Sequence, residues 1–98
     1  MSNAIFFNSY KLKKGASVPE FLQAVEKLTE QTSKQKGWIS FNLYVEGETW
    51  ADMATFETMD DAKEFAKSGG PKDLAEKFYS FINFNSCRTH FFETVIAK

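Results

Sequence analysis

The chain has 98 residues and a formal net charge of −1, a balance that excludes the basic surface needed for non-specific binding of nucleic acids. The length predicts a single domain over residues 1–98; no apolar run approaches the roughly 20 residues of a membrane span and no signal peptide is visible, so we expect a cytoplasmic protein. A lone cysteine, Cys87, excludes an internal disulfide, and without a Cys/His cluster the sequence predicts no metal site.

The first predicted elements are a strand and a helix. Apolar residues occupy both faces of residues 5–13, which is typical of a strand covered on both sides. Ser17 and Glu20 then form a capping-box sequence, with Pro19 in the first helical turn. An apolar stripe at helical spacing continues to Thr32, and Gly37 fits the C-terminal cap of this helix.

Residues 38–57 predict a β-hairpin. Every second residue from Ile39 to Val45 is apolar, and Glu46-Gly47-Glu48 supplies the turn. A three-residue turn pairs Phe41 with Met53 and keeps the apolar row together. A two-residue turn at Glu46-Gly47 would place Asp52 on that row, and we reject it because a one-residue slip exchanges the two faces of a strand. The second face then holds Trp38, Asn42, Tyr44, Trp50, Asp52, Ala54 and Phe56.

The last third of the chain predicts a divided helix and a final strand. A second helix-start signature spans residues 58–61, and Ser68-Gly69-Gly70-Pro71 interrupts the helix before a second piece from Lys72 to about Ile82. Residues 83–85 are predicted as a loop and residues 87–97 as a strand. The order of elements predicts an α+β, ferredoxin-like βαββαβ fold with a four-stranded antiparallel sheet.

Two helices cover only one face of such a sheet. The rows that contain Phe6, Asn8 and Tyr10 on the first strand, and the second face of the hairpin, would then lie open to water. Because the chain contains eleven Phe, three Tyr and two Trp, we expect more than one surface to be buried. The simplest arrangement is a homodimer in which the two sheets cover each other.

The chain resembles the dimeric α/β barrels of the antibiotic biosynthesis monooxygenase type. The resemblance spans nearly the whole chain and rests on the order of elements, on KGWISFNLYVEG after the first helix, and on TFETMDDAKEF before the second. It implies sheet-to-sheet dimers with a cavity beside each sheet, and cofactor-independent oxygenation of electron-rich aromatic compounds such as anthrones or quinols. A haem-degrading branch shares the fold, and Asn8 resembles its first-strand asparagine. Similar proteins have tryptophan where this chain has Phe56, and neither predicted helix contains a histidine to bind haem.

An oxygenase without a cofactor has to bind a flat acidic phenol and hold its anion, a task that suits aromatic walls with a few amide or hydroxyl groups. We predict as catalytic residues Asn8 and Asn42, which would hydrogen-bond a substrate oxygen, and His90, the one imidazole, as a base. The predicted substrate-binding residues are Tyr10, Trp38, Tyr44, Trp50 and Phe56. The competing interpretation is that these residues pack a dimer interface and that His90 is structural.

Asp52 shares the second face of the hairpin with Trp50. If it were buried, its charge would need a partner such as Arg88 or His90, and if it lay near the mouth of the hairpin it would be solvated, which we favour. Three functions remain open: a monooxygenase acting on a small phenolic, anthrone or quinol-like compound, a non-catalytic small-molecule-binding or stress-related barrel, and a purely structural dimer. A cavity bordered by Asn8, Asn42 and Tyr44 would distinguish the first two from the third.

Overall fold

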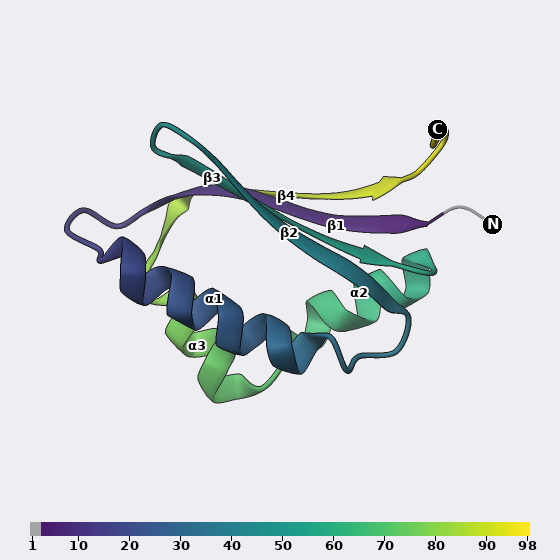
Figure 1. Ribbon diagram of the computed structural model, residues 1–98, viewed down its shortest axis with the longest axis horizontal. Helices are drawn as coiled ribbons and strands as arrows, with labels where there is room; N and C mark the ends of the chain where they lie inside the picture. Colours follow the sequence, from purple (N-terminus) through teal and green to yellow (C-terminus); the bar gives the residue numbers. More distant parts are fainter. Residues whose placement is uncertain (1–2) are drawn as a thin grey trace.

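In a computed structural model, which describes residues 3–98, four strands form one antiparallel sheet and three helices cover a single face of it (Figure 1). The strands are β1 (Ala4–Leu12), β2 (Trp38–Glu46), β3 (Thr49–Phe56) and β4 (Ile82–Glu93), and the helices are α1 (Val18–Thr32), α2 (Met59–Ser68) and α3 (Lys72–Tyr79). The sheet order is β2-β3-β1-β4, which leaves β2 and β4 at the edges. The predicted ferredoxin-like fold is confirmed, with its second helix divided into α2 and α3.

The helices α1 and α2 begin where the sequence predicts. The Ser17 hydroxyl accepts a hydrogen bond from the Glu20 N–H at 3.4 Å, and the Thr58 hydroxyl accepts one from the Asp61 N–H at 3.0 Å. Each cap satisfies a backbone donor that has no partner inside the helix. Within residues 3–98, none of the helices combines the length and the apolar character that a membrane crossing requires.

The predicted role of Gly37 as a helix cap is wrong. Helix α1 already ends at Thr32, and Gly37 lies directly before β2 with a φ of +80°. Its carbonyl accepts a hydrogen bond from the Glu57 N–H at 2.7 Å, and a Cβ at this position would collide with the side chain of Asp61. Gly37 therefore allows the chain that enters β2 to pass close to the start of α2.

The hairpin turn contains two residues rather than three. Glu46 pairs with Thr49, and Gly47-Glu48 forms the loop, with a φ of +59° at the glycine. A positive φ at the first central residue alone is the pattern of a type II′ turn, whose twist matches that of the flanking strands. The predicted register is therefore wrong by one residue, and Phe41 pairs with Ala54.

This register places every second residue of β3, from Trp50 to Phe56, on the face that the helices cover. Strands β1 and β3 contribute to that face Phe6, Asn8, Tyr10, Trp50, Asp52, Ala54 and Phe56. Trp38 of β2 packs with them. The opposite face holds Ile5, Phe7, Asn42, Tyr44, Ala51, Met53, His90 and Phe92. The prediction that the rows of Phe6, Asn8 and Tyr10, and of Trp38, Trp50 and Phe56, lie open to water is thus wrong.

The boundaries of the last two elements also differ from the prediction. Helix α3 ends at Tyr79, and β4 begins at Ile82 and ends at Glu93, so residues 83–85 belong to a strand rather than a loop. The pairing of β1 with β4 is irregular, because residues 84–87 lie opposite the short segment between Ser9 and Lys11. A bulge of this kind bends the strand and increases its twist.

The core consists of two clusters of buried side chains. The first cluster surrounds Phe21 of α1, whose ring packs against those of Tyr10, Trp50 and Phe78. The second surrounds Phe56 at the other end of the sheet and contains alanines from β1, β3 and α2. Residues of both clusters line the space between them, and this space is the candidate site.

Candidate functional site

A small cavity of about 50 Å³ lies between the sheet and the helices. Its apolar walls come from three strands and all three helices, and they include Phe6, Phe41, Phe56, Leu28, Phe65 and Phe78. Its polar lining consists of Asn8, Thr29, Thr32, Trp38, Asp52 and Tyr79. The volume suffices for about three or four water molecules and is well below the roughly 150 Å³ of a cavity that binds benzene. An aromatic ligand must therefore extend beyond this space or widen it.

The cavity adjoins a hollow on the surface between α1 and the edge strand β2. Thr29, Trp38 and Phe41 line both spaces. The hollow measures about 470 Å³, and its remaining wall is formed by Glu26, Glu30, Ser33 and Ser40. We call this hollow the portal. A ligand larger than the cavity can lie partly in the cavity and partly in the portal.

Asp52 lies at the cavity wall and is only 7% exposed. The Tyr10 hydroxyl donates a hydrogen bond to its Oδ2 at 2.8 Å, and the Asn8 amide donates one to its Oδ1 at 3.2 Å. The preferred prediction, a solvated Asp52, is wrong. The partners considered for a buried carboxylate were also wrong, since Tyr10 and Asn8 take the place of Arg88 and His90.

Burial is the main influence on the ionisation of this site. It raises the pKa of Asp52 from 3.8 to about 6, although the hydrogen bonds from Tyr10 and Asn8 act in the opposite direction. Burial and the neighbouring charge of Asp52 raise the pKa of Tyr10 far above its ordinary value, so its hydroxyl remains a donor. The pKa of Tyr79 is raised by the same two causes. Asp52 thus titrates in the range that suits a general base near neutral pH.

A row of polar side chains crosses three neighbouring strands. Asn8 of β1 pairs directly with Asp52 of β3 and with Thr89 of β4. The Thr89 hydroxyl donates a hydrogen bond to Asn8 Oδ1 at 2.6 Å. Because an amide has one oxygen acceptor and one nitrogen donor, this bond directs the Asn8 nitrogen toward Asp52. Thr89 is exposed, so the row connects the buried carboxylate with the surface at β4.

The cavity contains no positively charged side chain. None of its lining residues is Lys, Arg or His. Across residues 3–98, no group of three or more His, Cys, Asp or Glu side chains is arranged to hold a metal ion. When Asp52 is ionised, its charge is stabilised by the dipoles of Tyr10 and Asn8. An uncharged or cationic ligand suits such a site better than an anion.

The residues predicted as a site are divided between the two faces of the sheet. Three of them line the cavity: Asn8, Trp38 and Phe56. Two lie in the first core cluster: Tyr10, which also binds Asp52, and Trp50, which packs on Phe21. Three lie on the opposite face: Asn42, Tyr44 and His90. The ring of His90 is stacked on that of Phe92, with 5.3 Å between the centroids. The predicted border of the cavity is therefore correct for Asn8 and wrong for Asn42 and Tyr44.

Sequence reasoning missed three contributors to the site: Asp52 as a buried group, Thr89 and Tyr79. A signal existed for Asp52, because a glycine at the first position of a two-residue turn favours the Gly47-Glu48 loop and hence the observed register. No comparable signal exists for Thr89 or Tyr79. Their positions depend on the long-range pairing of β4 with β1 and on the packing of α3.

No protein-family model and no curated protein matches this sequence, but solved structures do share its fold. SnoaB from Streptomyces nogalater, a cofactor-independent oxygenase solved in a mutant form, matches with a TM-score of 0.82 and 13% identity over 99% of this chain and 97% of that chain. A candidate antibiotic biosynthesis monooxygenase from Nitrosomonas europaea matches with a TM-score of 0.77 and 10% identity, covering 95% and 90%. A conserved protein from Methanosarcina mazei Go1 matches with a TM-score of 0.76 and 17% identity, covering 94% and 92%. The chain therefore has the fold that its resemblance to the antibiotic biosynthesis monooxygenase type implied.

Proposed function

We propose that the protein is a cofactor-independent monooxygenase whose substrate is a small phenolic, anthrone or quinol-like compound. The observation that supports this most directly is the buried carboxylate of Asp52, with its pKa raised to about 6, in the wall of an aromatic cavity. The likeness in fold to SnoaB, itself a cofactor-independent oxygenase, supports the same class of reaction. In this proposal Asp52 is the catalytic base, Asn8 positions it, and Trp38 and Phe56 form the walls.

The chemistry needs a base and a hydrophobic space more than it needs a cofactor. Asp52 removes a proton from an acidic C–H or O–H group, and the aromatic walls hold the resulting anion against dioxygen. A C–O bond forms to give a peroxide, which takes a proton back from Asp52 and eliminates water. In balance, a methylene group and one molecule of dioxygen give a carbonyl group and one molecule of water. The substrate supplies all the electrons, so no external reductant takes part.

A second candidate function is the non-catalytic binding of a small molecule. One observation favours it: both carboxylate oxygens of Asp52 already accept hydrogen bonds from neighbouring side chains. A carboxylate held in this way also suits a fixed acceptor for a ligand hydroxyl group. In that case the ligand would bind in the cavity and the portal and no oxygen would be consumed.

Oxygen consumption with a panel of anthrones and hydroquinones distinguishes these two functions. We expect the wild-type protein to consume oxygen and oxidised product to appear in equal amounts with at least one compound. Asn8→Ala should lower kcat by about 10- to 100-fold, because a hydrogen bond to a charged group typically contributes about 1.5–3 kcal/mol. The matched control is Asn42→Ala, which removes an exposed amide from the opposite face and should leave the rate unchanged.

Two results would contradict the proposal. Binding of the compounds without oxygen consumption by the wild-type protein would favour the binding function. Equal rates in the Asn8→Ala and Asn42→Ala variants would remove the role of Asn8.

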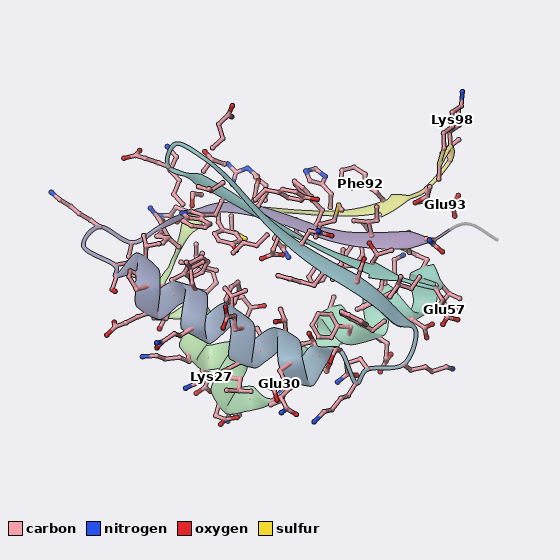
Figure 2. All side chains as sticks on the ribbon, in the orientation of Figure 1. Lys27, Glu30, Glu57, Phe92, Glu93 and Lys98 are labelled. Atoms are coloured by element: carbon pink, nitrogen blue, oxygen red, sulfur yellow. The ribbon has the colours of Figure 1, made fainter. Side chains whose placement is uncertain are left out.

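We also propose that two copies of the chain associate through the sheet face that the helices leave open. Figure 2 shows Phe92 of β4 on that face, directed away from the helices, and its side chain is 47% exposed. Tyr44 of β2 is 50% exposed on the same face, and Ile5, Phe7 and Met53 lie there half-buried. An apolar surface of this kind on a small protein favours contact with a second copy.

The double substitution of Tyr44→Glu and Phe92→Glu should convert the dimer to a monomer. Association would then bury carboxylates without partners, which costs more than the contact supplies. Light scattering coupled to size-exclusion chromatography measures the molar mass. Val95→Glu is the control, since Val95 is 88% exposed but lies beyond the end of β4. A wild-type protein that is monomeric at micromolar concentration would contradict the proposed dimer.

A further inference from the structure

Trp38 carries a buried hydrogen-bond donor that has no acceptor. Its indole Nε1 is shielded from solvent and makes no hydrogen bond. Buried polar groups in folded proteins nearly always have a partner, so each exception requires a physical reason. Trp38 lines both the cavity and the portal, at the boundary between the two spaces. A ligand that fills both spaces must pass this residue.

We propose that the Trp38 indole N–H donates a hydrogen bond to the carbonyl oxygen of an uncharged aromatic ligand that enters through the portal. This inference rests on the binding part of the proposed function, because it names the class of compound that the same site takes. Asp52 accepts a hydrogen bond from the hydroxyl group of the ligand in the cavity, and Trp38 binds the carbonyl nearer the surface. A phenol with a carbonyl group on the far side of its ring carries one hydrogen-bonding partner for each of these residues.

The size of the cavity supports a ligand of this shape. At about 50 Å³ the cavity is too small for a whole aromatic ring, whereas the portal beside it measures about 470 Å³. A ring whose hydroxyl end reaches Asp52 therefore extends past Trp38 and Phe41 into the portal. Trp38, the residue that carries the unpaired donor, lines both spaces, where a group is needed to hold the outer half of the ligand.

The charges along this course exclude anionic ligands. Glu26 and Glu30 belong to the portal wall and Asp52 to the cavity wall, while no Lys, Arg or His lines either space. A ligand carboxylate would lose water of hydration and meet only like charges. A ketone or quinone oxygen is uncharged, and an indole N–H is a suitable donor to it.

Three para-substituted phenols test the proposal. The first, 4′-hydroxyacetophenone, carries both a hydroxyl and a carbonyl group, 4-ethylphenol lacks the carbonyl, and 4-hydroxybenzoate carries a negative charge. Isothermal titration gives their Kd values for the wild-type protein and for Trp38→Phe, which keeps an aromatic ring but removes the donor. Trp38→Phe should weaken the binding of 4′-hydroxyacetophenone by about 5- to 20-fold and leave that of 4-ethylphenol nearly unchanged. The wild-type protein should bind 4-hydroxybenzoate about tenfold more weakly than 4′-hydroxyacetophenone, or not at all.

The matched control is Trp50→Phe, because Trp50 packs in the first core cluster and does not line the cavity. Its Kd values for all three phenols should equal those of the wild-type protein. This variant also leaves Trp38 as the one tryptophan, so a single indole N–H signal remains in a nitrogen-15 NMR spectrum. That signal should move downfield on saturation with 4′-hydroxyacetophenone and not with 4-ethylphenol.

Three results would overturn the inference: equal losses of affinity for the two neutral phenols in Trp38→Phe, an indole signal that does not move, or no binding of 4′-hydroxyacetophenone by the wild-type protein. Tighter binding of 4-hydroxybenzoate would overturn the argument from charge. Oxygen consumption distinguishes this failure from that of the proposed function. If anthrones or hydroquinones are oxidised while Trp38→Phe weakens the binding of both neutral phenols equally, this inference alone is wrong. If Trp38 binds the carbonyl and no compound is oxidised, the oxygenase activity alone is wrong.

Discussion

Asp52→Asn is expected to remove oxygen consumption and, at the same time, to make the folded protein more stable at pH 8. The loss of a general base typically lowers kcat by about 10²- to 10⁴-fold. The carboxylate is buried among aromatic residues and its pKa is raised to about 6, so its ionised form destabilises the fold. A residue that destabilises the protein and serves its chemistry is the usual result of selection for function.

The sign of the stability change follows from the two pKa values of Asp52. The pKa is about 6 in the folded protein, against 3.8 for an unperturbed carboxyl group. The folded state therefore holds the proton more tightly, and ionisation favours unfolding. The penalty is absent below about pH 4, grows between about pH 4 and 6, and is complete above that range, where it reaches about 2–3 kcal/mol. Asparagine avoids this penalty but offers a single acceptor oxygen to Tyr10 and Asn8. We therefore expect the free energy of unfolding to increase by about 1–2 kcal/mol at pH 8.

Urea unfolding at pH 4 and pH 8 measures the stability difference, and an oxygen electrode measures the rate. The wild-type rate should rise as the pH increases through about 6, since the base acts only when ionised. Glu57→Gln is the control, because Glu57 is an exposed carboxylate just beyond the end of β3 (Figure 2). A variant less stable than the wild-type protein at pH 8 would contradict the electrostatic argument. Retained activity would show that Asp52 is not the base.

Phe21→Ala should produce the largest loss of stability, about 3–5 kcal/mol. Phe21 is completely buried, and its ring lies 5.2–6.3 Å, between centroids, from those of Tyr10, Trp50, Phe78 and Phe81. Truncation removes these contacts from the centre of the first core cluster and leaves a void that its neighbours fill only in part. For a domain of this size the expected decrease in Tm is about 15–30 °C.

Thermal and urea unfolding of the variant provide the measurement. Leu22→Ala is the matched control at the next position of α1, where the side chain is 39% exposed. It should lower the free energy of unfolding by less than about 1 kcal/mol. A similar loss in both variants would show that the helix as a whole, rather than the buried ring, determines the stability. A loss below about 1 kcal/mol for Phe21→Ala would show that the cluster repacks around the void.

The parts of the fold that follow from local chemistry could be predicted, and those that depend on pairing between distant segments could not. Ser17 and Thr58 cap their helices through residues three positions further along the chain, so the sequence alone locates both starts. The sheet register depended on whether Gly47 begins a two-residue loop or lies inside a three-residue loop. That difference of one residue reversed the face assigned to Asp52, and with it the side of the sheet on which we expected the site.

Asn8 and Trp38 were correctly singled out, but for reasons that the structure changes. Asn8 was expected to contact a substrate, and it binds Asp52 instead. Trp38 was expected to bind a substrate through its aromatic ring as part of an aromatic wall, and its unpaired indole nitrogen is the feature on which the further inference rests. Neither fact is visible in the sequence, because the first depends on strand register and the second on the gap between α1 and β2.

The row formed by Asp52, Asn8 and Thr89 also affects the register of the strands. If β1 slipped by one residue against β3, Asp52 would lie opposite Phe7 or Ser9 instead of Asn8. The carboxylate would lose the amide donor, and with it part of what makes its burial tolerable. A misaligned sheet is thereby penalised at Asp52, in addition to the loss of apolar packing. The groups proposed to act on a substrate thus also favour the observed register of β3, β1 and β4.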